Sequence, residues 1–291
     1  MGASTGGDDR AVKVRVWGCR GSLASPGPET VRFGGQTSCV SVQLSDGSLL
    51  ILDAGSGIRP LGMALGGDHP ERIDVFITHL HTDHIEGLRF FDPIWDPSVE
   101  LNVWGPPSPI RGLRSRIAPY FAPPFFPVHL RSIPSHPEFR DTPTRTWRIG
   151  SAAVTAQLVK HPGPTVGYRV EENGHALAYL PDHEPALGSD LSTVGTEWIS
   201  GFALAEGSTV LLHDAQYTKA EYDERVGWGH SSTEDAVTFG RRAGAERLVL
   251  FHHDPLHTDT QLEGVLARAK ELSASGPDEV ELAREGMTFE L

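Results

Sequence analysis

Apolar and polar residues follow one another in short, ordered stretches along most of the chain, and glycine or proline residues separate these stretches. Residues 12–19 alternate and have a glycine near their end, at position 18, which predicts a strand. Residues 38–44 and 49–55 flank the turn "SDGS" and predict a β-hairpin. Residues 72–78 form an apolar run typical of a buried strand, and residues 59–65 predict a short helix.

The second half of the chain repeats this mixture. Strands are expected over residues 152–159, 166–172, 176–182, 208–215 and 245–255. Helices are expected over residues 198–204, 232–244 and 258–275. The helix over 232–244 begins with a Ser or Thr cap and acidic residues and ends in glycine, as helix termini prefer. Two batches of strands interleaved with helices indicate a layered α/β domain.

Residues 90–147 differ from their surroundings because they are dense in proline and aromatic residues. One short strand near 99–105 and one helix near 109–121 are expected there, in a rigid surface excursion of mostly irregular structure. The alternatives are a cover over a pocket or a contact between two copies in a homodimer. Three of its phenylalanines could stack on a substrate base or pack in such a contact, namely Phe121, Phe125 and Phe126. We expect residues 1–10 to form a disordered tail and residues 11–291 to form a single domain.

Composition narrows the classes of protein. The formal charge of −13 argues against a protein that grips long nucleic acid by its phosphates, since that needs clustered Lys and Arg. Two cysteines, Cys19 and Cys39, are too few for a disulfide framework and fit buried thiols in a reducing compartment. The start lacks the apolar segment of a secretory signal, and no apolar run is long enough to span a membrane. These features predict a cytoplasmic protein without a membrane partner.

The stretch "THLHTDHIEG" carries three histidines and one aspartate within residues 79–84, directly after the apolar run 72–78. In a turn after a strand, His79 and His81 can reach one point in space, while Asp83 and His84 face a second point nearby. Neutral imidazoles and carboxylates are ligands that zinc, manganese and iron accept. The stretch therefore predicts a metal site, and a two-metal site needs more ligands at the ends of other strands.

The chain offers three such ligands. His161 in "LVKHPGPTVGY", Asp182 in "ALAYLPDHE" and His252 in "LVLFHHDP" each follow an apolar, strand-like run. His253 is the alternative to its neighbour His252. Five further histidines are expected at the surface or at the rim of the site, namely His129, His136, His175, His183 and His257.

With these residues, the sequence resembles the metallo-β-lactamase superfamily, and "LILDAG" before the histidine motif strengthens the resemblance. The segments "GCRGSLASPGPETVRFGGQTSCVSV", "HPGPTVGYRV", "LLHDAQY" and "GHSS" resemble its phosphodiesterase branch, which includes ribonuclease Z and the cyclic-phosphate diesterases. The resemblance covers nearly the whole chain. It implies a four-layer αββα sandwich with two divalent metal ions at one edge, of which zinc or manganese is expected first and iron is the alternative.

The resemblance also implies a ligand set. The first metal would be held by His79, His81 and His161, and the second by Asp83, His84 and His252. Asp182 would bridge the two metals. A hydroxide between the metals would act as the nucleophile, since coordination lowers the pKa of water.

The same resemblance implies roles for residues around the metals. His230 in "WGHSS" would donate a proton to the leaving oxygen, and Asp214 would orient His230, with His213 as the alternative to Asp214. Asp83 would also be a catalytic residue, because it would bind the second metal. Asp53 would brace the histidine loop from behind.

These features predict a dinuclear metal-dependent phosphodiesterase that acts on a small cyclic nucleotide or cyclic phosphate. One alternative is a hydrolase of carboxylic esters, thioesters or lactones, and another is a di-iron protein that senses dioxygen. Transfer RNA is not expected as a partner, for two reasons. The chain is acidic, and a hairpin fills the interval between His161 and Asp182 where ribonuclease Z carries its RNA-binding arm.

Overall fold

The computed structural model describes residues 11–273, 277 and 279–291, so the expected tail at residues 1–10 lies outside the described residues. The described chain forms two seven-stranded sheets. In spatial order the first sheet contains β14 (Thr288–Glu290), β1 (Lys13–Gly18), β2 (Cys39–Gln43), β3 (Leu49–Leu52), β4 (Arg72–Phe76), β5 (Glu100–Gly105) and β6 (Glu138–Asp141). The predicted hairpin is confirmed, because β2 and β3 pair antiparallel from Val40–Leu52 to Gln43–Leu49.

The second sheet has the same number of strands. In spatial order it contains β13 (Glu279–Leu282), β12 (Arg247–Phe251), β11 (Val210–Asp214), β10 (His175–Leu180), β9 (Val166–Glu172), β8 (Ala152–Leu158) and β7 (Thr146–Ile149). Strands β10 to β13 are parallel, whereas β7 to β10 form antiparallel pairs. Strands β3 to β6 of the first sheet are also parallel. The carboxyl ends of these parallel strands are where side chains of a binding site are expected.

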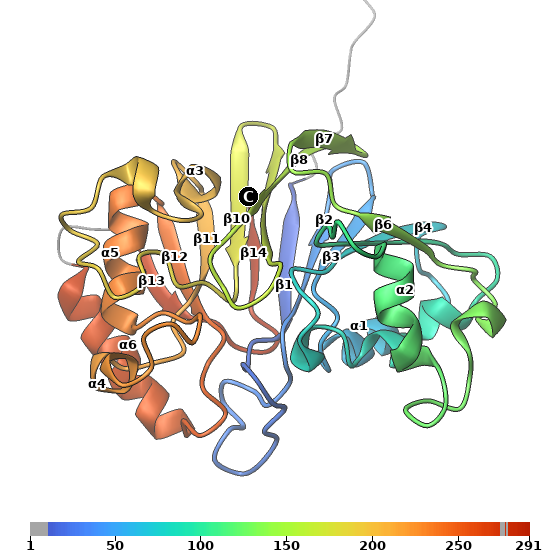
Figure 1. The fold of residues 1–291 in the computed structure, drawn as a ribbon, viewed down its shortest axis with the longest axis horizontal. Helices are drawn as coiled ribbons and strands as arrows, with labels where there is room; N and C mark the ends of the chain where they lie inside the picture. The colour runs from blue at the N-terminus through green and yellow to red at the C-terminus, as the bar shows by residue number, and fades with distance from the viewer. Residues whose placement is uncertain (1–10, 274–276, 278) are drawn as a thin grey trace, which may run out of the picture.

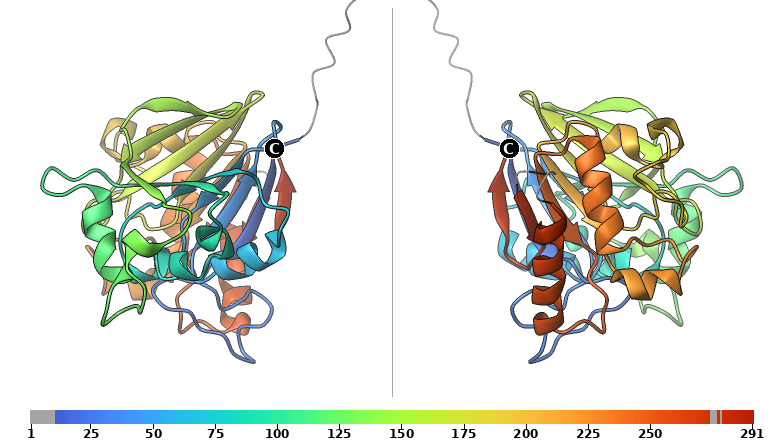
Figure 2. Two further views of the ribbon diagram at one scale, coloured as in Figure 1. Left: turned by 90° about the vertical axis from the view of Figure 1, so that its right-hand side faces the viewer. Right: turned by 90° about the vertical axis from the view of Figure 1, so that its left-hand side faces the viewer.

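The two sheets lie face to face with helices on both outer sides (Figure 1). The central core consists of inward-facing residues of both sheets, such as Val40 and Phe76 of the first and Tyr168 and Phe251 of the second. The outer face of the first sheet packs on α1 (Ile58–Leu65) and α2 (Leu113–Ile117). The outer face of the second packs on α3 (Phe202–Ala205), α5 (Thr233–Ala243) and α6 (Asp259–Leu272), of which α5 and α6 lie side by side (Figure 2). The predicted four-layer αββα sandwich is confirmed.

Local sequence signals explain the two longest helices. Ser232 caps α5 by accepting a hydrogen bond from the backbone N–H of Asp235 (3.0 Å), and Gly244 ends the helix in the left-handed conformation (φ +67°). Thr258 and Gln261 form a capping box at the start of α6. Both helices were predicted, the first from its cap, its acidic first turn and its terminal glycine, and the structure confirms it between Ser232 and Gly244. The capping box of the second was not among the signals used.

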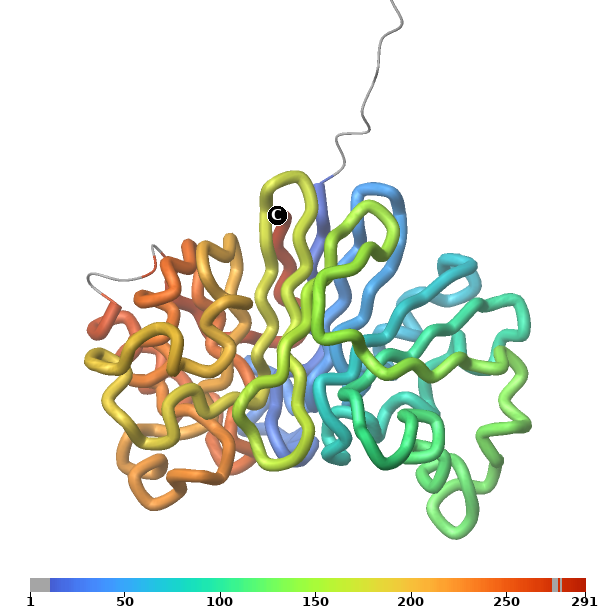
Figure 3. Tube along the Cα trace, turned by 45° about the horizontal axis from the view of Figure 1, so that its top comes forward, coloured from blue at the N-terminus to red at the C-terminus, as the bar shows by residue number. Residues whose placement is uncertain are grey.

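The proline-rich block at residues 90–147 is more regular than its composition indicates. It contributes β5 and β6 to one edge of the first sheet and begins β7 of the second sheet, so the expectation of a single short strand is wrong. Strand β6 has mostly exposed or half-buried side chains, as an edge strand allows, and therefore lacks the apolar alternation by which strands are recognised. The block lies at one end of the molecule (teal to green, on the right in Figure 3).

Three further short elements were not expected from the sequence, namely β13, β14 and α4 (Lys219–Asp223). No helix in the part of the chain that the structure describes combines the length and the apolar character needed to cross a bilayer.

Candidate metal centre

The predicted ligands converge at one edge of the two sheets because each follows the end of a strand. The histidine motif follows β4 and ends in the short 3-10 helix η1 (Thr82–His84). Asp182 follows β10, and His252 follows β12. His161 lies in the loop between β8 and β9. Strand β11 ends in Asp214, so both sheets contribute side chains to the same place.

One group of candidate ligand atoms comprises His79, His81, His161 and Asp182, whose ligand atoms all lie within 4.8 Å of one another. His161 Nε2 lies 3.2 Å from His81 Nδ1 and 3.7 Å from Asp182 Oδ2. His79 Nε2 lies 3.6 Å from the same carboxylate oxygen. His81 is exposed to solvent and the other three residues are buried, so the group opens to the surface on one side.

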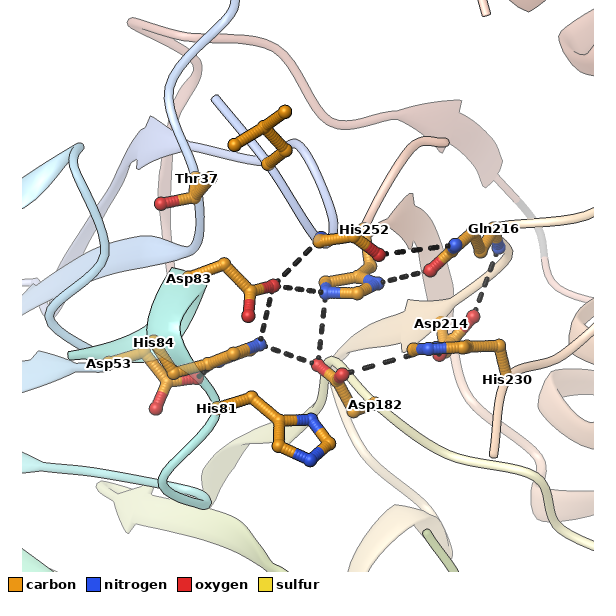
Figure 4. Close-up of polar contacts among 12 residues, drawn as sticks. Thr37, Asp53, His81, Asp83, His84, Asp182, Asp214, Gln216, His230 and His252 are labelled. Atoms are coloured by element: carbon orange, nitrogen blue, oxygen red, sulfur yellow. Dashed lines mark hydrogen bonds and ion pairs between the residues drawn. The ribbon is translucent and has the colours of Figure 1, made fainter. Parts of the chain in front are cut away.

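A second group comprises Asp83, His84 and His252. Asp83 Oδ2 lies 3.3 Å from the Nε2 atoms of both His84 and His252. Asp182 Oδ1 lies 2.9 Å from His84 Nε2 and 3.1 Å from His252 Nε2. Oδ1 of Asp182 therefore faces the second group (Figure 4), and its Oδ2 faces the first group, which is the arrangement expected of a bridging ligand.

Hydrogen bonds on the far side of three imidazoles fix which nitrogen faces the centre. His84 Nδ1–H donates to Asp53 Oδ2 (2.8 Å), and His161 Nδ1–H donates to the carbonyl of Gly229 (2.8 Å). His252 Nδ1–H donates to Gln216 Oε1 (2.9 Å). In each ring Nε2 is therefore the atom turned toward the carboxylates, an arrangement typical of metal-binding histidines.

Asp53 connects several parts of the histidine loop. This fully buried residue has a positive φ of +59°, which a non-glycine residue seldom adopts. Its carboxylate accepts hydrogen bonds from the backbone N–H of Thr78 (2.7 Å), the hydroxyl of Tyr179 (3.0 Å) and the imidazole of His84. It thus braces the loop from behind, in the position that the sequence predicted.

The centre concentrates negative charge that calls for a cation. Four aspartates, Asp53, Asp83, Asp182 and Asp214, are buried there. Burial opposes a charge on His84, but the carboxylates of Asp182, Asp83 and Asp53 outweigh burial and raise the pKa of His84 well above its ordinary value. The electrostatic field that favours a proton on His84 also favours a metal ion. The residues therefore fit divalent cations by charge as well as by ligand type.

Unpartnered buried atoms support the same conclusion. Among the described residues, His79 Nε2, His84 Nε2 and Asp182 Oδ1 are buried and make no hydrogen bond of normal geometry, although buried polar atoms are normally paired; the contacts described above between them are ion-pair distances only. Burial, together with the neighbouring histidines, holds the pKa of His79 well below its ordinary value, so its ring stays neutral and keeps a lone pair. All three atoms point into the centre, where a cation would satisfy them.

His230 and Asp214 form a pair beside this centre. The Nδ1–H of His230 donates to Asp214 Oδ2 at 2.7 Å, and the same nitrogen lies 3.9 Å from Asp182 Oδ2. Burial opposes a charge on His230, but Asp214 outweighs it and raises the pKa of His230 to about 9. The ring therefore carries a proton near neutral pH. His230 also forms a third group of candidate ligand atoms with Asp182 and His252, all within 4.8 Å of one another.

The two alternatives left open by the sequence point elsewhere. His213 is buried against Phe239, with ring centroids 4.6 Å apart, and donates from Nδ1 to the backbone carbonyl of Asp214. His253 donates from Nε2 to the carbonyl of Ala283 (2.8 Å) in the interior. Neither ring contacts the predicted ligands through a hydrogen bond or ion pair among the described residues.

A cavity of about 390 Å³ opens onto the centre. Its lining consists of Ser22, Leu80, His81, Thr82, Asp83, Tyr120, Asp182 and His230. Tyr120 is the one lining residue from the block 90–147, and the carbonyls of Tyr120 and Phe125 both accept hydrogen bonds from Arg89 (3.1 Å each). Phe121 is only 2% exposed and belongs to the core, and Phe125 is 71% exposed. Tyr120 therefore reaches the cavity, and the expected phenylalanines do not line it.

Two features of the site were not predicted from the sequence. Gln216 orients His252, as described above, and its backbone N–H donates to Asp214 Oδ1 (3.0 Å); its place in "HDAQY", next to Asp214, was the available signal. His183 was expected at the surface but is fully buried, with Nδ1 donating to His213 Nε2 (3.0 Å). A histidine can be buried when a neighbouring acceptor takes its ring N–H, and the sequence does not reveal such a partner.

Comparison with known proteins supports the assignment of the fold. Residues 50–253, which include every predicted ligand, match the model of the beta-lactamase superfamily domain. A ribonuclease Z of Thermoplasma acidophilum is 25% identical over 265 residues, covering 77% of this chain and 82% of the relative. The structure of YhfI, a metallo-beta-lactamase fold protein of Bacillus subtilis, has a TM-score of 0.68 at 19% identity and covers 97% of this chain and 100% of its own. Human tRNase Z, short form, has a TM-score of 0.64 at 24% identity, covering 95% and 98% of the two chains.

The expectation that transfer RNA is not a partner is wrong. Curated relatives from several organisms are named ribonuclease Z, and one similar structure is named tRNase Z. The physical reason is that net charge sums over the whole surface and does not describe the local potential of a binding face. The hairpin β9–β10 fills the interval between His161 and Asp182, and this has no bearing on RNA contacts made by other parts of the chain.

Proposed function

Because the chain belongs to the beta-lactamase superfamily, we propose that it is a metal-dependent hydrolase of phosphodiester bonds. One observation carries this proposal: the imidazole of His230, paired with Asp214 at 2.7 Å, lines the same cavity as the predicted metal ligands. Hydrolysis of a phosphodiester with an alcohol leaving group benefits from a proton donor at this place. The relatives named ribonuclease Z agree with this class of bond.

The residues proposed to hold the metals form the two groups that Asp182 connects. The first ion would be held by His79, His81 and His161, the second by Asp83, His84 and His252, with Asp182 shared between them. Divalent cations held there would lower the pKa of bound water and neutralise charge on the phosphoryl oxygens. Zinc and manganese are the proposed metals because neutral imidazoles and carboxylates are ligands for both.

Side chains of the protein would donate the proton and orient the metal ligands. Asp214 fixes the tautomer of His230 by accepting from Nδ1–H, which leaves Nε2 to give a proton to the leaving oxygen. Asp53, Gly229 and Gln216 hold three imidazoles so that their Nε2 atoms face inward. Among the described residues, no lysine or arginine lines the cavity, so the charge of the phosphate would have to be met by the metals and by His230.

The substrate proposed from the sequence is a small cyclic nucleotide or cyclic phosphate. The cavity of about 390 Å³ has room for the reacting phosphodiester and part of a nucleoside. Because relatives are named ribonuclease Z and tRNase Z, RNA, including transfer RNA, is a second proposed substrate. Both substrates present a phosphodiester with an alcohol leaving group, so the chemistry derived above is common to them.

The test is hydrolysis of bis(p-nitrophenyl) phosphate by protein stripped with a chelator and then reloaded with Zn²⁺ or Mn²⁺. We expect turnover only in the reloaded protein. A panel with 2′,3′-cyclic AMP, 3′,5′-cyclic AMP and a transfer RNA transcript extended at both ends would then define the substrate.

Absence of diester hydrolysis in protein shown to be loaded with metal would contradict the proposal. Faster hydrolysis of carboxylic esters or thioesters than of phosphodiesters would favour an ester hydrolase instead. Iron in protein purified without oxygen, with an oxygen-dependent absorption band, would favour the dioxygen-sensing alternative.

A further inference from the structure

Glu184 is a fully buried carboxylate to which the site described above assigns no role. It lies two residues after Asp182, at the carboxyl end of β10. Its Oε1 accepts hydrogen bonds from the hydroxyl of Tyr222 (2.9 Å) and the backbone N–H of Gly227 (2.8 Å), and its Oε2 accepts from the backbone N–H of Gly229 (2.8 Å). Burial of a carboxylate costs free energy unless hydrogen bonds compensate for the lost water, so each of the three donors contributes to the stability of this arrangement.

The loop that Glu184 binds contains two glycines in a backbone conformation that depends on outside contacts. Gly227 and Gly229 have φ values of +89° and +93°, a conformation that other residues adopt only under strain. A Cβ atom at Gly227 would meet open space, whereas one at Gly229 would overlap Pro162 and the ring of His161. The backbone N–H groups of these two glycines point inward, and Glu184 is the acceptor of both.

This loop connects a predicted metal ligand with the proposed proton donor. The carbonyl of Gly229 accepts the hydrogen bond from His161 Nδ1–H, and the next residue is His230. Glu184 holds the N–H side of Gly229, while Asp214 holds the imidazole of His230. The position of His230 is therefore determined from two directions, by one carboxylate on its backbone side and by another on its ring.

We propose that Glu184 is a positioning residue for His230, because it clamps Gly227 and Gly229 and so sets the height of the imidazole over the reacting phosphodiester. The inference rests on the proposed function, in which His230 protonates the leaving oxygen. Glu184 touches no residue that lines the cavity through a hydrogen bond, so it acts through the loop and not on the substrate. A shift of about 1 Å in a positioned group is enough to lower the rate strongly.

The test is the substitution Glu184→Gln, which keeps the shape of the side chain but replaces one acceptor oxygen by an NH₂ group facing a donor. Turnover is compared on methyl phenyl phosphate and methyl p-nitrophenyl phosphate. Phenolate is the poorer leaving group and needs the proton more, so we expect a loss of about 100-fold on the phenyl ester and less than about 10-fold on the p-nitrophenyl ester. Metal content should equal that of the wild type, and a crystal structure should show a longer distance between His230 and Asp214.

The matched control is Glu172→Gln. Glu172 is another buried carboxylate and accepts hydrogen bonds from the backbone N–H and the hydroxyl of Ser45, at the end of β9. Its substitution should lower thermal stability and leave the ratio of the two rates unchanged. If Glu184→Gln does not fold, Gly227→Ala strains one end of the same loop, where the added Cβ meets open space, and should give the same selective loss.

Equal losses on the two esters, or unchanged rates, would overturn the inference, as would loss of metal, which would place the effect on His161. These outcomes are distinct from failure of the proposed function, in which the wild type with metal bound cleaves neither ester. In that case the inference is decided by the crystal structure alone. An unmoved His230 in the variant then refutes it, and a displaced His230 supports it.

Discussion

At the scale of single residues, the centre depends on hydrogen bonds that lie one step behind the predicted ligands. Asp53, Gln216 and the carbonyl of Gly229 each hold one imidazole by its Nδ1–H. Only Asp53 was predicted. Its signal was its place in "LILDAG", whereas a backbone carbonyl carries no signal in a sequence, and an amide such as Gln216 is common on surfaces.

Replacement of Asp53 by Asn should weaken metal binding by about 10- to 100-fold. The carboxamide cannot accept all the hydrogen bonds that Asp53 receives from Thr78, His84 and Tyr179, so the ring of His84 loses its orientation. Affinity for Zn²⁺ can be measured by competition with a chromophoric chelator.

The matched control is Asp74→Asn in β4, a buried carboxylate that accepts hydrogen bonds from Arg72 and Trp104 and none from the histidine loop. Equal zinc affinities for Asp53→Asn and the wild type would show that Asp53 does not support the ligands.

At the scale of elements, the ends of strands could be predicted and the irregular block could not. His79, Asp182 and His252 were placed correctly at strand ends because each follows a clear apolar run. The block 90–147 lacked such patterns, and its edge strand β6 and the beginning of β7 were missed. Aromatic density alone did not distinguish Phe121, which packs in the core, from Tyr120, which reaches the cavity.

Replacement of Tyr120 by Ala should alter which diesters are cleaved. If its ring stacks on a base, its loss lowers kcat/KM for nucleotide substrates by about tenfold, mainly through KM, while bis(p-nitrophenyl) phosphate is less affected. Kinetics on a cyclic nucleotide and on the aryl diester provide the comparison.

Phe125→Ala is the control, because Phe125 lies on the same segment, is exposed and does not line the cavity. If Tyr120→Ala, Phe125→Ala and the wild type cleave the same substrates at the same relative rates, residues 90–147 have a purely structural role.

At the scale of the whole molecule, the fold class could be predicted from the sequence, whereas the distribution of charge over the surface could not. The order of apolar runs predicted a layered α/β domain, and the resemblance to the metallo-β-lactamase superfamily implied two sheets between helices, as the structure has them. The total charge of −13 led to a wrong exclusion of transfer RNA, because a sum over all side chains has no position on the surface.

Buried histidines make stability depend on pH. Burial lowers the pKa of His213 to about 4 and that of His253 to about 3. Between pH 6.5 and 4 the unfolded chain therefore binds more protons than the folded one, and the free energy of unfolding falls as the pH is lowered. Each of the two histidines should remove roughly 2 kcal/mol between pH 7 and pH 5.

Urea denaturation with a chelator present, so that metal release does not contribute, measures this loss. In the variant His213→Gln the loss between pH 7 and pH 5 should be smaller by about 2 kcal/mol, whatever its stability at pH 7. An identical pH dependence in the variant would mean that His213 is not held neutral by the fold.

The central claim is that His230 protonates the leaving group beside a metal centre that it does not itself hold. It is tested most directly by measuring metal content and turnover on methyl phenyl phosphate in the same preparation of His230→Ala. We predict unchanged metal content and a rate lower by about 10²- to 10⁴-fold. Loss of metal would make His230 a ligand, as its distance to Asp182 and His252 allows, and a rate equal to that of the wild type would remove it from the reaction.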